Sequence, residues 1–260
     1  MHGLASVATP TWRSSTMGTT GARRKFERHP TMPYGVLFLV LGGSLATLAF
    51  LQGGAGWALL WPALSFAAAG GAYLRGRPAM LGKRDGGTFA WWAPVLFGPF
   101  LLLTWSIWCI ERTVSREDAA NEVAPGVWVG RRPLAHEVPA NIGAVVDLTA
   151  ELPAAAGVRR RAGYVCVPVL DGTAPDAETL RSLMDRLRDE KGILLHCASG
   201  HGRSATVAAA LMMARGLAGD VEEAEAQMRR ARPGIRLRAG QRALVRRPTL
   251  WRSRRDLAQP

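Results

Sequence analysis

Three long apolar runs without any charged residue dominate the first half of the chain and constrain its fold most strongly. They cover residues 34–52, 56–74 and 87–110 of the 260. Each reaches the roughly 17–25 residues that a helix needs to cross a bilayer. Buried core helices can be as apolar, but a soluble domain of this size rarely carries three such runs together. The sequence therefore predicts three transmembrane helices within residues 34–111, and hence an integral membrane protein.

The character of the chain changes on either side of these runs. Residues 1–33 are polar and basic, which predicts a disordered N-terminus. Residues 112–122 read as a charged linker, and a soluble domain is expected over residues 112–250, followed by a basic tail at 251–260. Within that domain, short apolar runs alternate with segments of helical spacing. This alternation predicts an α/β fold, with a mainly parallel sheet flanked by helices.

The expected elements of the soluble domain are short. Strands are predicted at 127–129, 144–148, 164–169 and 193–195, and helices at 176–188, 207–217, 221–230 and 241–245.

The net charge and the number of cysteines indicate which partners and cofactors to expect. The net charge is +13, but the basic residues are dispersed and form no stripe interleaved with aromatic side chains. We therefore expect no nucleic-acid binding, and attribute the positive charge to anionic lipids or anionic substrates. The three cysteines, Cys109, Cys166 and Cys197, are too few and too scattered for a disulfide framework or a metal cluster. No metal and no cofactor is expected.

Residues 196–204 carry the most specific pattern in the chain, His-Cys-Ala-Ser-Gly-His-Gly-Arg-Ser. An apolar run leads into it and a helix-like run leads out, so Cys197 stands at a strand-to-helix turn. The field at a helix N-terminus favours anions, which suits both a thiolate and a phosphate group. Gly200 and Gly202 let the backbone curl around an anion, and Arg203 offers a planar fork to two phosphoryl oxygens. The predicted phosphate-binding loop comprises His196, Ala198, Ser199, Gly200, His201 and Gly202.

Cleavage of a phosphate ester by Cys197 would also need an acid to protonate the leaving oxygen. Asp171 is the leading candidate, because it stands in a turn directly after an expected strand. Asp176 is the alternative, although its position suits the cap of a helix N-terminus. Asp147 lies inside a strand pattern and is more readily explained as structural. These three carboxylates remain open as candidates at this stage.

The loop resembles the signature of the cysteine-dependent tyrosine and dual-specificity phosphatases, His-Cys-x-x-Gly-x-x-Arg-Ser/Thr, and every fixed position is filled. Further similarity lies in Gly126-Val127-Trp128-Val129-Gly130 and in the Arg-Pro segment at 232–236, so that the resemblance covers roughly residues 122–247. It implies that Ser204 eases departure of the thiolate and that His196 is buried and supports the loop through hydrogen bonds. His201 is either a second anion contact or a plain surface residue.

The resemblance implies a membrane-anchored phosphatase that works through a cysteinyl-phosphate intermediate. The substrate would be a phosphorylated protein or a lipid or inositol phosphate, and membrane lipids would be its other partner. As a whole the chain resembles a bacterial group in which hydrophobic helices precede such a domain, which places it in the inner membrane. Two alternatives remain: a non-catalytic, membrane-tethered phosphate-binding module, and a rhodanese-like sulfurtransferase.

Two features of the sequence predict opposite orientations of the chain in the membrane. The segment before the first run and the connection after the second are both basic, and the positive-inside rule places both in the cytoplasm. Three crossings would then put the catalytic domain outside, which the sequence slightly favours. A reactive thiolate, however, works best in a reducing compartment. Either one run does not cross fully, or the domain faces outward.

Overall fold

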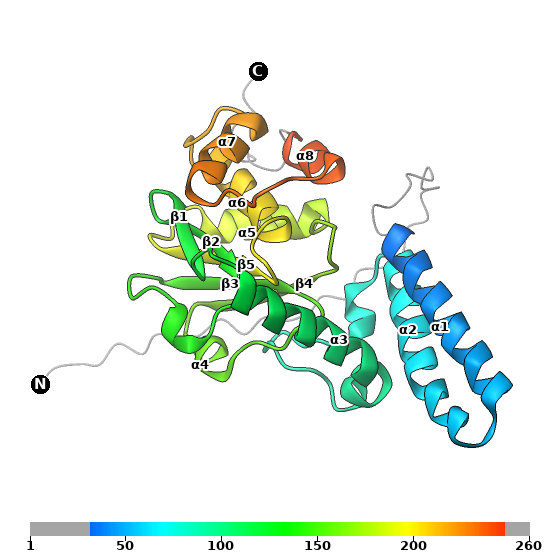
Figure 1. Ribbon diagram of the computed structural model, residues 1–260. Coiled ribbons are helices and arrows are strands. Elements are labelled where there is room, and N and C mark those ends of the chain that lie inside the picture. The colour runs from blue at the N-terminus through cyan, green and yellow to red at the C-terminus, as the bar shows by residue number, and fades with distance from the viewer. Residues whose placement is uncertain (1–31, 248–260) are drawn as a thin grey trace, which may run out of the picture.

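A computed structural model describes residues 32–247, and the predictions for residues 1–31 and for the basic tail lie outside these residues. The chain forms a layered α/β domain with apolar helices packed beside it (Figure 1). Met32 and Pro33, expected in the disordered segment, already belong to the first helix.

The apolar first half is helical, in agreement with the sequence. Helices α1 and α2 pack closely along their length, because small residues let their backbones approach. A Cβ atom added at Gly42 would lie 2.8 Å from the carbonyl oxygen of Ala63. The elements of this half are α1 (Met32–Gln52), the 3₁₀ turn η1 (Gly54–Leu59), α2 (Leu60–Leu74), the 3₁₀ turn η2 (Pro78–Leu81) and α3 (Trp92–Val114).

Helix α3 is shifted relative to the third apolar run. Residues 87–91 are not helical, and Gly87 adopts a positive φ of 75°, which a glycine accommodates without strain. At its other end α3 continues to Val114. It includes Glu111 and Arg112, whose charged side chains form hydrogen bonds with residues of the following domain. The predicted linker at 112–122 is therefore wrong in part. Its first three residues end α3, and its last three begin an edge strand.

The second half forms a five-stranded sheet in the order β1-β2-β5-β3-β4. Only β1 pairs with its neighbour in the antiparallel direction, so the expectation of a mainly parallel sheet is confirmed. All four predicted strands are present, and the sequence missed the edge strand β1. The strands are β1 (Ala120–Ala124), β2 (Val127–Arg131), β3 (Ala144–Thr149), β4 (Tyr164–Val169) and β5 (Ile193–Cys197).

Alternation along the strands divides the interior of this domain into two layers. On one face, Val146 and Leu195 pack with helices α5 to α8 in the main hydrophobic core. On the other face, Val145 and Leu194 pack with the short helix α4 in a smaller cluster. The helices are η3 (Ala135–Glu137), α4 (Ala156–Arg159), α5 (Ala177–Leu187), α6 (Arg203–Ala214), α7 (Val221–Ala231) and α8 (Ala239–Val245).

A third cluster joins the two halves of the molecule. Aromatic side chains of α2 and α3, among them Phe66, Phe97 and Phe100, pack together with Ala150 and Leu170 of the α/β domain. The apolar helices are thus fastened to the domain and do not hang from it on a free linker.

Candidate active site

The residues of the sequence motif form a tight loop between β5 and α6, at the carboxyl end of the central strand of the sheet. Strand β5 lies between β2 and β3 and ends at Cys197. The loop then curls back so that the backbone N–H of Gly200 donates to the Cys197 sulfur at 3.2 Å. Gly200 has a φ of 81°, and a Cβ atom there would lie 2.4 Å from the carbonyl carbon of Gly130. Only glycine fits this position.

Cys197 is buried, with 3% of its surface exposed, and its sulfur faces the start of α6. The Ser204 hydroxyl lies 3.4 Å from the sulfur. Gly202 caps α6 through its backbone, and its carbonyl oxygen accepts from both the N–H and the hydroxyl of Thr206. The sulfur therefore lies among the donors that gather at a helix N-terminus, where a negative charge is favoured.

Arg203 is fully enclosed, and its guanidinium is gripped from one side. Both of its terminal nitrogens donate to Glu151, Nη1 to Oε2 at 2.9 Å and Nη2 to Oε1 at 2.7 Å, and Nη1 also donates to the Val169 carbonyl at 2.8 Å. Burial opposes the charge, but the carboxylates of Glu151 and Asp171 hold the pKa of Arg203 above its usual range. Its Nε–H has no partner among the described residues. A buried donor of this kind is costly unless a ligand uses it.

Glu151 is the residue that the sequence reasoning missed. It follows β3 by two residues and is 4% exposed, so its carboxylate lies under the loop. A lone acidic residue just beyond the carboxyl end of a buried strand was the available signal. That signal does not identify its partner, because Arg203 stands 52 positions away.

Of the three candidate acids, only Asp171 reaches the loop with an accessible carboxylate. It follows β4, its side chain is 52% exposed, and Oδ1 lies 3.2 Å from Arg203 Nη2. Asp176 instead caps α5, accepting from the Thr179 N–H at 2.9 Å. Asp147 is wholly buried and paired with Lys83 at 2.8 Å. The geometry therefore separates one candidate for the acid from two structural carboxylates.

His196 is buried directly before the cysteine, as the resemblance implies. Burial lowers its pKa to about 4, although the nearby Asp147 carboxylate opposes this shift. Within the described residues neither ring nitrogen makes a hydrogen bond of regular geometry, but Nδ1 lies 4.0 Å from Asp147, and interaction with the Cys197 backbone in the loop raises the pKa of His196 against the effect of burial.

The outer side of the loop is tied to the segment that follows α3. His201 pairs with Glu117 at 2.6 Å, so this histidine is not a free anion contact. Arg232 donates to the carbonyl oxygens of Ser199 and Gly200, at 2.9 and 3.2 Å. The remaining loop residue, Ala198, accepts from the Arg132 N–H at 3.1 Å.

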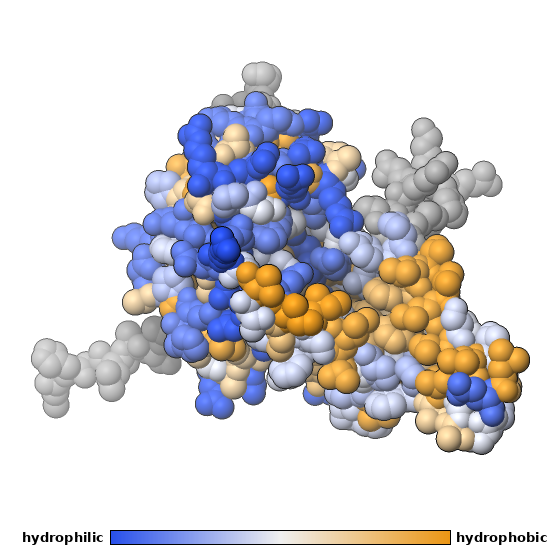
Figure 2. Space-filling view, viewed as in Figure 1, coloured by the Kyte–Doolittle hydropathy of each residue, from blue (hydrophilic) through white to orange (hydrophobic). Residues whose placement is uncertain are grey.

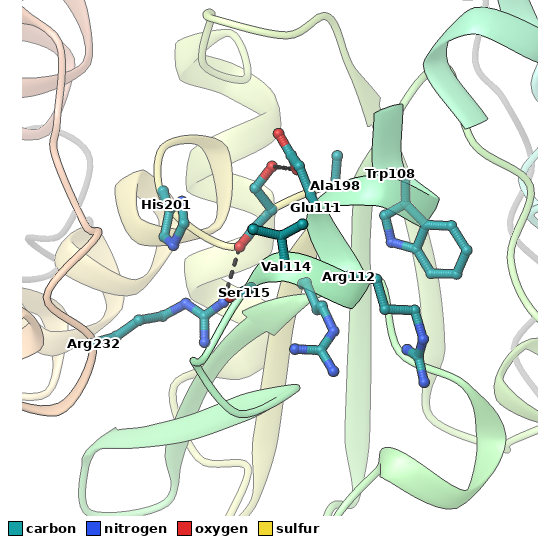
Figure 3. Close-up of a pocket in the computed structure, with 10 residues that line it drawn as sticks. Trp108, Glu111, Arg112, Val114, Ser115, Ala198, His201 and Arg232 are labelled. Carbon is teal, nitrogen blue, oxygen red and sulfur yellow. Dashed lines mark hydrogen bonds between the residues drawn. The ribbon is translucent and has the colours of Figure 1, made fainter. Parts of the chain in front are cut away.

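Two hollows flank the loop. One, of about 180 Å³, opens above Cys197 and Arg203, with Arg236 and Arg238 at its rim. The other, of about 270 Å³, lies between the loop and the end of α3 (Figure 3). It is lined by Trp108, Glu111, Arg112, Val114, Ser115, Arg131, Ala198, Ser199, His201 and Arg232. The first hollow contains the chemistry, and the second shows how closely α3 approaches it.

No cluster of three or more His, Cys, Asp or Glu side chains suited to a metal ion occurs in residues 32–247. The arrangement instead places one thiol, one enclosed guanidinium and one accessible carboxylate around a small basic hollow. Such a set can bind a phosphate dianion and transfer it to sulfur.

Comparison with known proteins begins with the families of protein domains. The family model described as "PTP-SAK: Swiss Army Knife protein, DSP-PTPase phosphatase domain" matches residues 131–250. No curated protein matches the sequence.

Three solved structures show the extent of the similarity to known folds. Tk-PTP in its active form is 33% identical, covering 49% of this chain and 93% of its own, with a TM-score of 0.42. A mouse putative dual specificity phosphatase is 25% identical, covering 50% and 86%, with a TM-score of 0.41. PTPMT1 in complex with PI(5)P is 19% identical, covering 49% and 92%, with a TM-score of 0.43.

The family assignment rests on the family model, whose matched residues contain the loop, Glu151 and Asp171. Strands β1 and most of β2 precede the matched residues but belong to the same sheet. Residues 131–250 therefore form a phosphatase domain of the dual-specificity branch of the cysteine-dependent phosphatases.

Proposed function

We propose that the protein is a membrane-anchored phosphatase that hydrolyses phosphate monoesters through a cysteinyl-phosphate intermediate. The observation that carries the proposal is the guanidinium of Arg203. It is fixed on one side by Glu151, while its Nε–H remains without a partner beside the buried Cys197. This is a preorganised receptor for a tetrahedral dianion.

In the first step the phosphate dianion enters the hollow and replaces Asp171 on Nη2 of Arg203. The Cys197 thiolate attacks phosphorus, a sulfur–phosphorus bond forms, and the bond from phosphorus to the ester oxygen breaks. Asp171, protonated, gives its proton to the leaving oxygen. Arg203 and the loop N–H groups hold the other phosphoryl oxygens, and they hold them better as charge develops in the transition state.

In the second step water cleaves the intermediate. Asp171, now a carboxylate, takes a proton from the attacking water, the sulfur–phosphorus bond breaks, and inorganic phosphate leaves. Cys197 departs as a thiolate. The Ser204 hydroxyl, 3.4 Å from the sulfur, donates to it and stabilises the leaving charge.

The anchoring in this proposal is supported by the three apolar helices, which are long and apolar enough to cross a membrane. The mouth of the active site lies against the first of them: Arg238 Nη2 donates to the Tyr34 hydroxyl at the start of α1, at 2.9 Å. A substrate at the bilayer surface would thus meet the rim of the hollow. Both phosphorylated membrane proteins and phospholipids fit this position.

The two alternatives are less well supported. A binding module without catalysis has no use for a buried thiol beside Arg203 and an accessible acid, and here all three are together. A sulfurtransferase needs neither the bidentate support of the arginine nor Ser204 behind the sulfur. The proposal accounts for each of these groups.

The test is phosphate release by the full chain in proteoliposomes. The substrates are a phosphotyrosine peptide, a phosphoserine peptide and phosphatidylglycerophosphate. Cys197→Ser should abolish release, while Cys166→Ser, which removes a thiol outside the hollow, should leave it intact. Rapid acid quenching should recover phosphate bound to the Cys197 peptide. Release that survives in Cys197→Ser would overturn the mechanism, and the preferred substrate decides between protein and lipid.

A further inference from the structure

The connection between α2 and α3 is fixed to the catalytic domain by a buried lysine. Lys83 is 7% exposed, and its Nζ donates to the Asp147 carboxylate at 2.8 Å and to the carbonyl and hydroxyl of Thr149 at 2.7 and 2.6 Å. Both acceptors belong to β3, the strand beside the one that ends in Cys197. Close by, the Ala154 N–H donates to the Gly87 carbonyl at 2.8 Å. This connection is part of the catalytic domain's own packing.

The opposite end of α3 is fixed to the same domain. Glu111 accepts from the hydroxyl of Ser199 in the phosphate loop at 2.5 Å, and Arg112 pairs with Glu137 at 2.7 Å. One turn earlier, the ring of Trp108 is covered by the guanidinium of Arg132, 4.6 Å from its centroid. The connection before α3 and the far end of α3 are thus fixed to one compact domain, and Ala93 and Phe97 at the start of the helix pack in one cluster with Ala150 and Leu170 of that domain. Figure 1 shows α3 lying across the front of the domain.

A helix fastened in this way cannot have a bilayer between its ends. Its 23 residues measure about 35 Å, comparable with the ~30 Å hydrocarbon core. If α3 crossed, Lys83 and the catalytic domain would lie on opposite faces of the membrane. The Lys83–Asp147 pair would then be lost, and each partner would need another counterion in order to remain charged and buried.

Helices α1 and α2 behave differently, since one end of their hairpin bonds the catalytic domain itself, whereas near the other end Trp61 Nε1 donates to the Val95 carbonyl at the start of α3, at 2.7 Å. Tyr34, at the start of α1, bonds Arg238, and Tyr73, at the end of α2, packs beside Leu170. The far end of the hairpin, formed by η1, contains no charged residue. In Figure 1 this hairpin projects away from the sheet.

We infer that the anchor crosses the membrane twice: α1 and α2 cross as a hairpin, and α3 lies against the catalytic domain without crossing, its apolar face in lipid. This rests on the membrane anchoring proposed above. The partner of this face is the bilayer, because its apolar surface runs on to that of α1 (Figure 2). Between 47% and 73% of each of these α3 residues is exposed: Val95, Leu102, Trp105, Ile107, Ile110 and Val114.

Two crossings remove the conflict in orientation. The basic N-terminal segment, the basic connection at 75–84 and the catalytic domain then share one side, and the positive-inside rule makes it the cytoplasm. The Cys197 thiol is thereby placed in the reducing compartment. A single assignment satisfies both the charge distribution and the chemistry.

The test is labelling of single cysteines by a membrane-impermeant maleimide, in the full chain with Cys109, Cys166 and Cys197 replaced by serine. Ala55→Cys reports the hairpin turn, Asp85→Cys the α2–α3 connection and Ala226→Cys, on α7, the catalytic domain, and all three positions are exposed. Sealed right-side-out and inside-out vesicles are labelled in parallel. Gel filtration confirms that each variant is folded, and carbonate extraction tests anchoring separately.

We expect Asp85→Cys and Ala226→Cys to react only in inside-out vesicles, and Ala55→Cys only in right-side-out vesicles. Labelling of Asp85→Cys and Ala226→Cys from opposite sides would show that α3 crosses, and would overturn the inference. Labelling of Ala55→Cys from the same side as the other two would overturn the crossing hairpin. Loss of the protein on carbonate extraction would refute the anchoring itself, independently of the labelling pattern.

Discussion

Two buried pairs of cation and carboxylate lie at the same end of the sheet, and they differ in what they leave unsatisfied. An ammonium group has three donors, and Lys83 uses all three, on Asp147 and Thr149. A guanidinium has five, and Arg203 keeps its Nε–H without a partner among the described residues and shares Nη2 with the exposed Asp171.

The comparison teaches how one kind of interaction serves two purposes. The Lys83–Asp147 pair is closed, meaning that every donor of the cation is bonded within the protein, and it joins the anchor to the domain. The Arg203–Glu151 pair is open, meaning that the Nε–H of Arg203 has no partner among the described residues and its Nη2 is shared with the exposed Asp171, so that both donors can bind a phosphate. Changes at the first pair should therefore lower stability, and changes at the second should lower the rate.

The largest effect is expected for Lys83→Met. The substitution leaves Asp147 buried without its cation, and breaking a buried pair in this way costs about 3–5 kcal/mol. Burial by itself would raise the pKa of Asp147, and the charge of Lys83 is the main reason that it lies below its usual range. The free energy of unfolding of the detergent-solubilised full chain, measured in urea, reports the loss.

Two further variants control this measurement. Asp147→Asn combined with Lys83→Met removes both charges and should recover a large part of the loss. Arg84→Met changes an exposed neighbour and should alter stability by no more than about 0.5 kcal/mol. A Lys83→Met protein as stable as Arg84→Met would mean that the closed pair does not hold the anchor to the domain.

Arg203→Lys should have the next largest effect, and on the rate. Lysine keeps the positive charge but cannot grip Glu151 with two nitrogens and offer a third donor to the substrate. Loss of a preorganised donor of this kind lowers kcat by about 10²–10³-fold. Steady-state kinetics on a phosphotyrosine peptide measures it. A kcat within threefold of the parent protein would contradict the open-pair assignment.

Acid should weaken the fold through His196, which lies 4.0 Å from the closed pair. Burial lowers the folded-state pKa of His196 to about 4, against about 6.5 when unfolded. Between these values the unfolded chain binds a proton that the folded chain does not, so stability is full above about pH 6.5 and falls as the pH drops toward 4, by about 3 kcal/mol. Urea unfolding of His196→Asn should lack this slope, and an unchanged slope would assign it to other groups.

Much of this arrangement was predictable from local sequence. The phosphate-binding loop could be predicted, because its nucleophile, its glycines and its arginine must follow one another closely in the sequence in order to enclose one anion. Strands β2, β3, β4 and β5 were also predictable, because each is a short apolar run. Strand β1 was not, since Asn121 and Glu122 at the sheet edge resemble a charged linker.

Long-range pairing could not be predicted in the same way. Nothing in the spacing of Glu151 and Arg203, or of Lys83 and Asp147, distinguishes them from other charged residues. The same limit applies to α3. Hydropathy measures its length and composition, whereas its relation to the membrane depends on contacts at its two ends.

Glu151→Gln should have the smallest effect, and it tests whether the open pair acts by positioning. Glutamine keeps the shape of the side chain, but one of its two oxygens becomes an amide nitrogen, so the bidentate grip on Arg203 is lost. We expect kcat to fall by about tenfold, because the guanidinium still accepts the substrate but is no longer held in one orientation. KM should change much less. Glu137→Gln, at a carboxylate paired with Arg112 and Arg131 outside the hollow, is the matched control and should keep the parent kcat. A purely structural role for Glu151 would instead lower the free energy of unfolding and leave kcat per folded molecule unchanged, and the two pairs would then not differ in function.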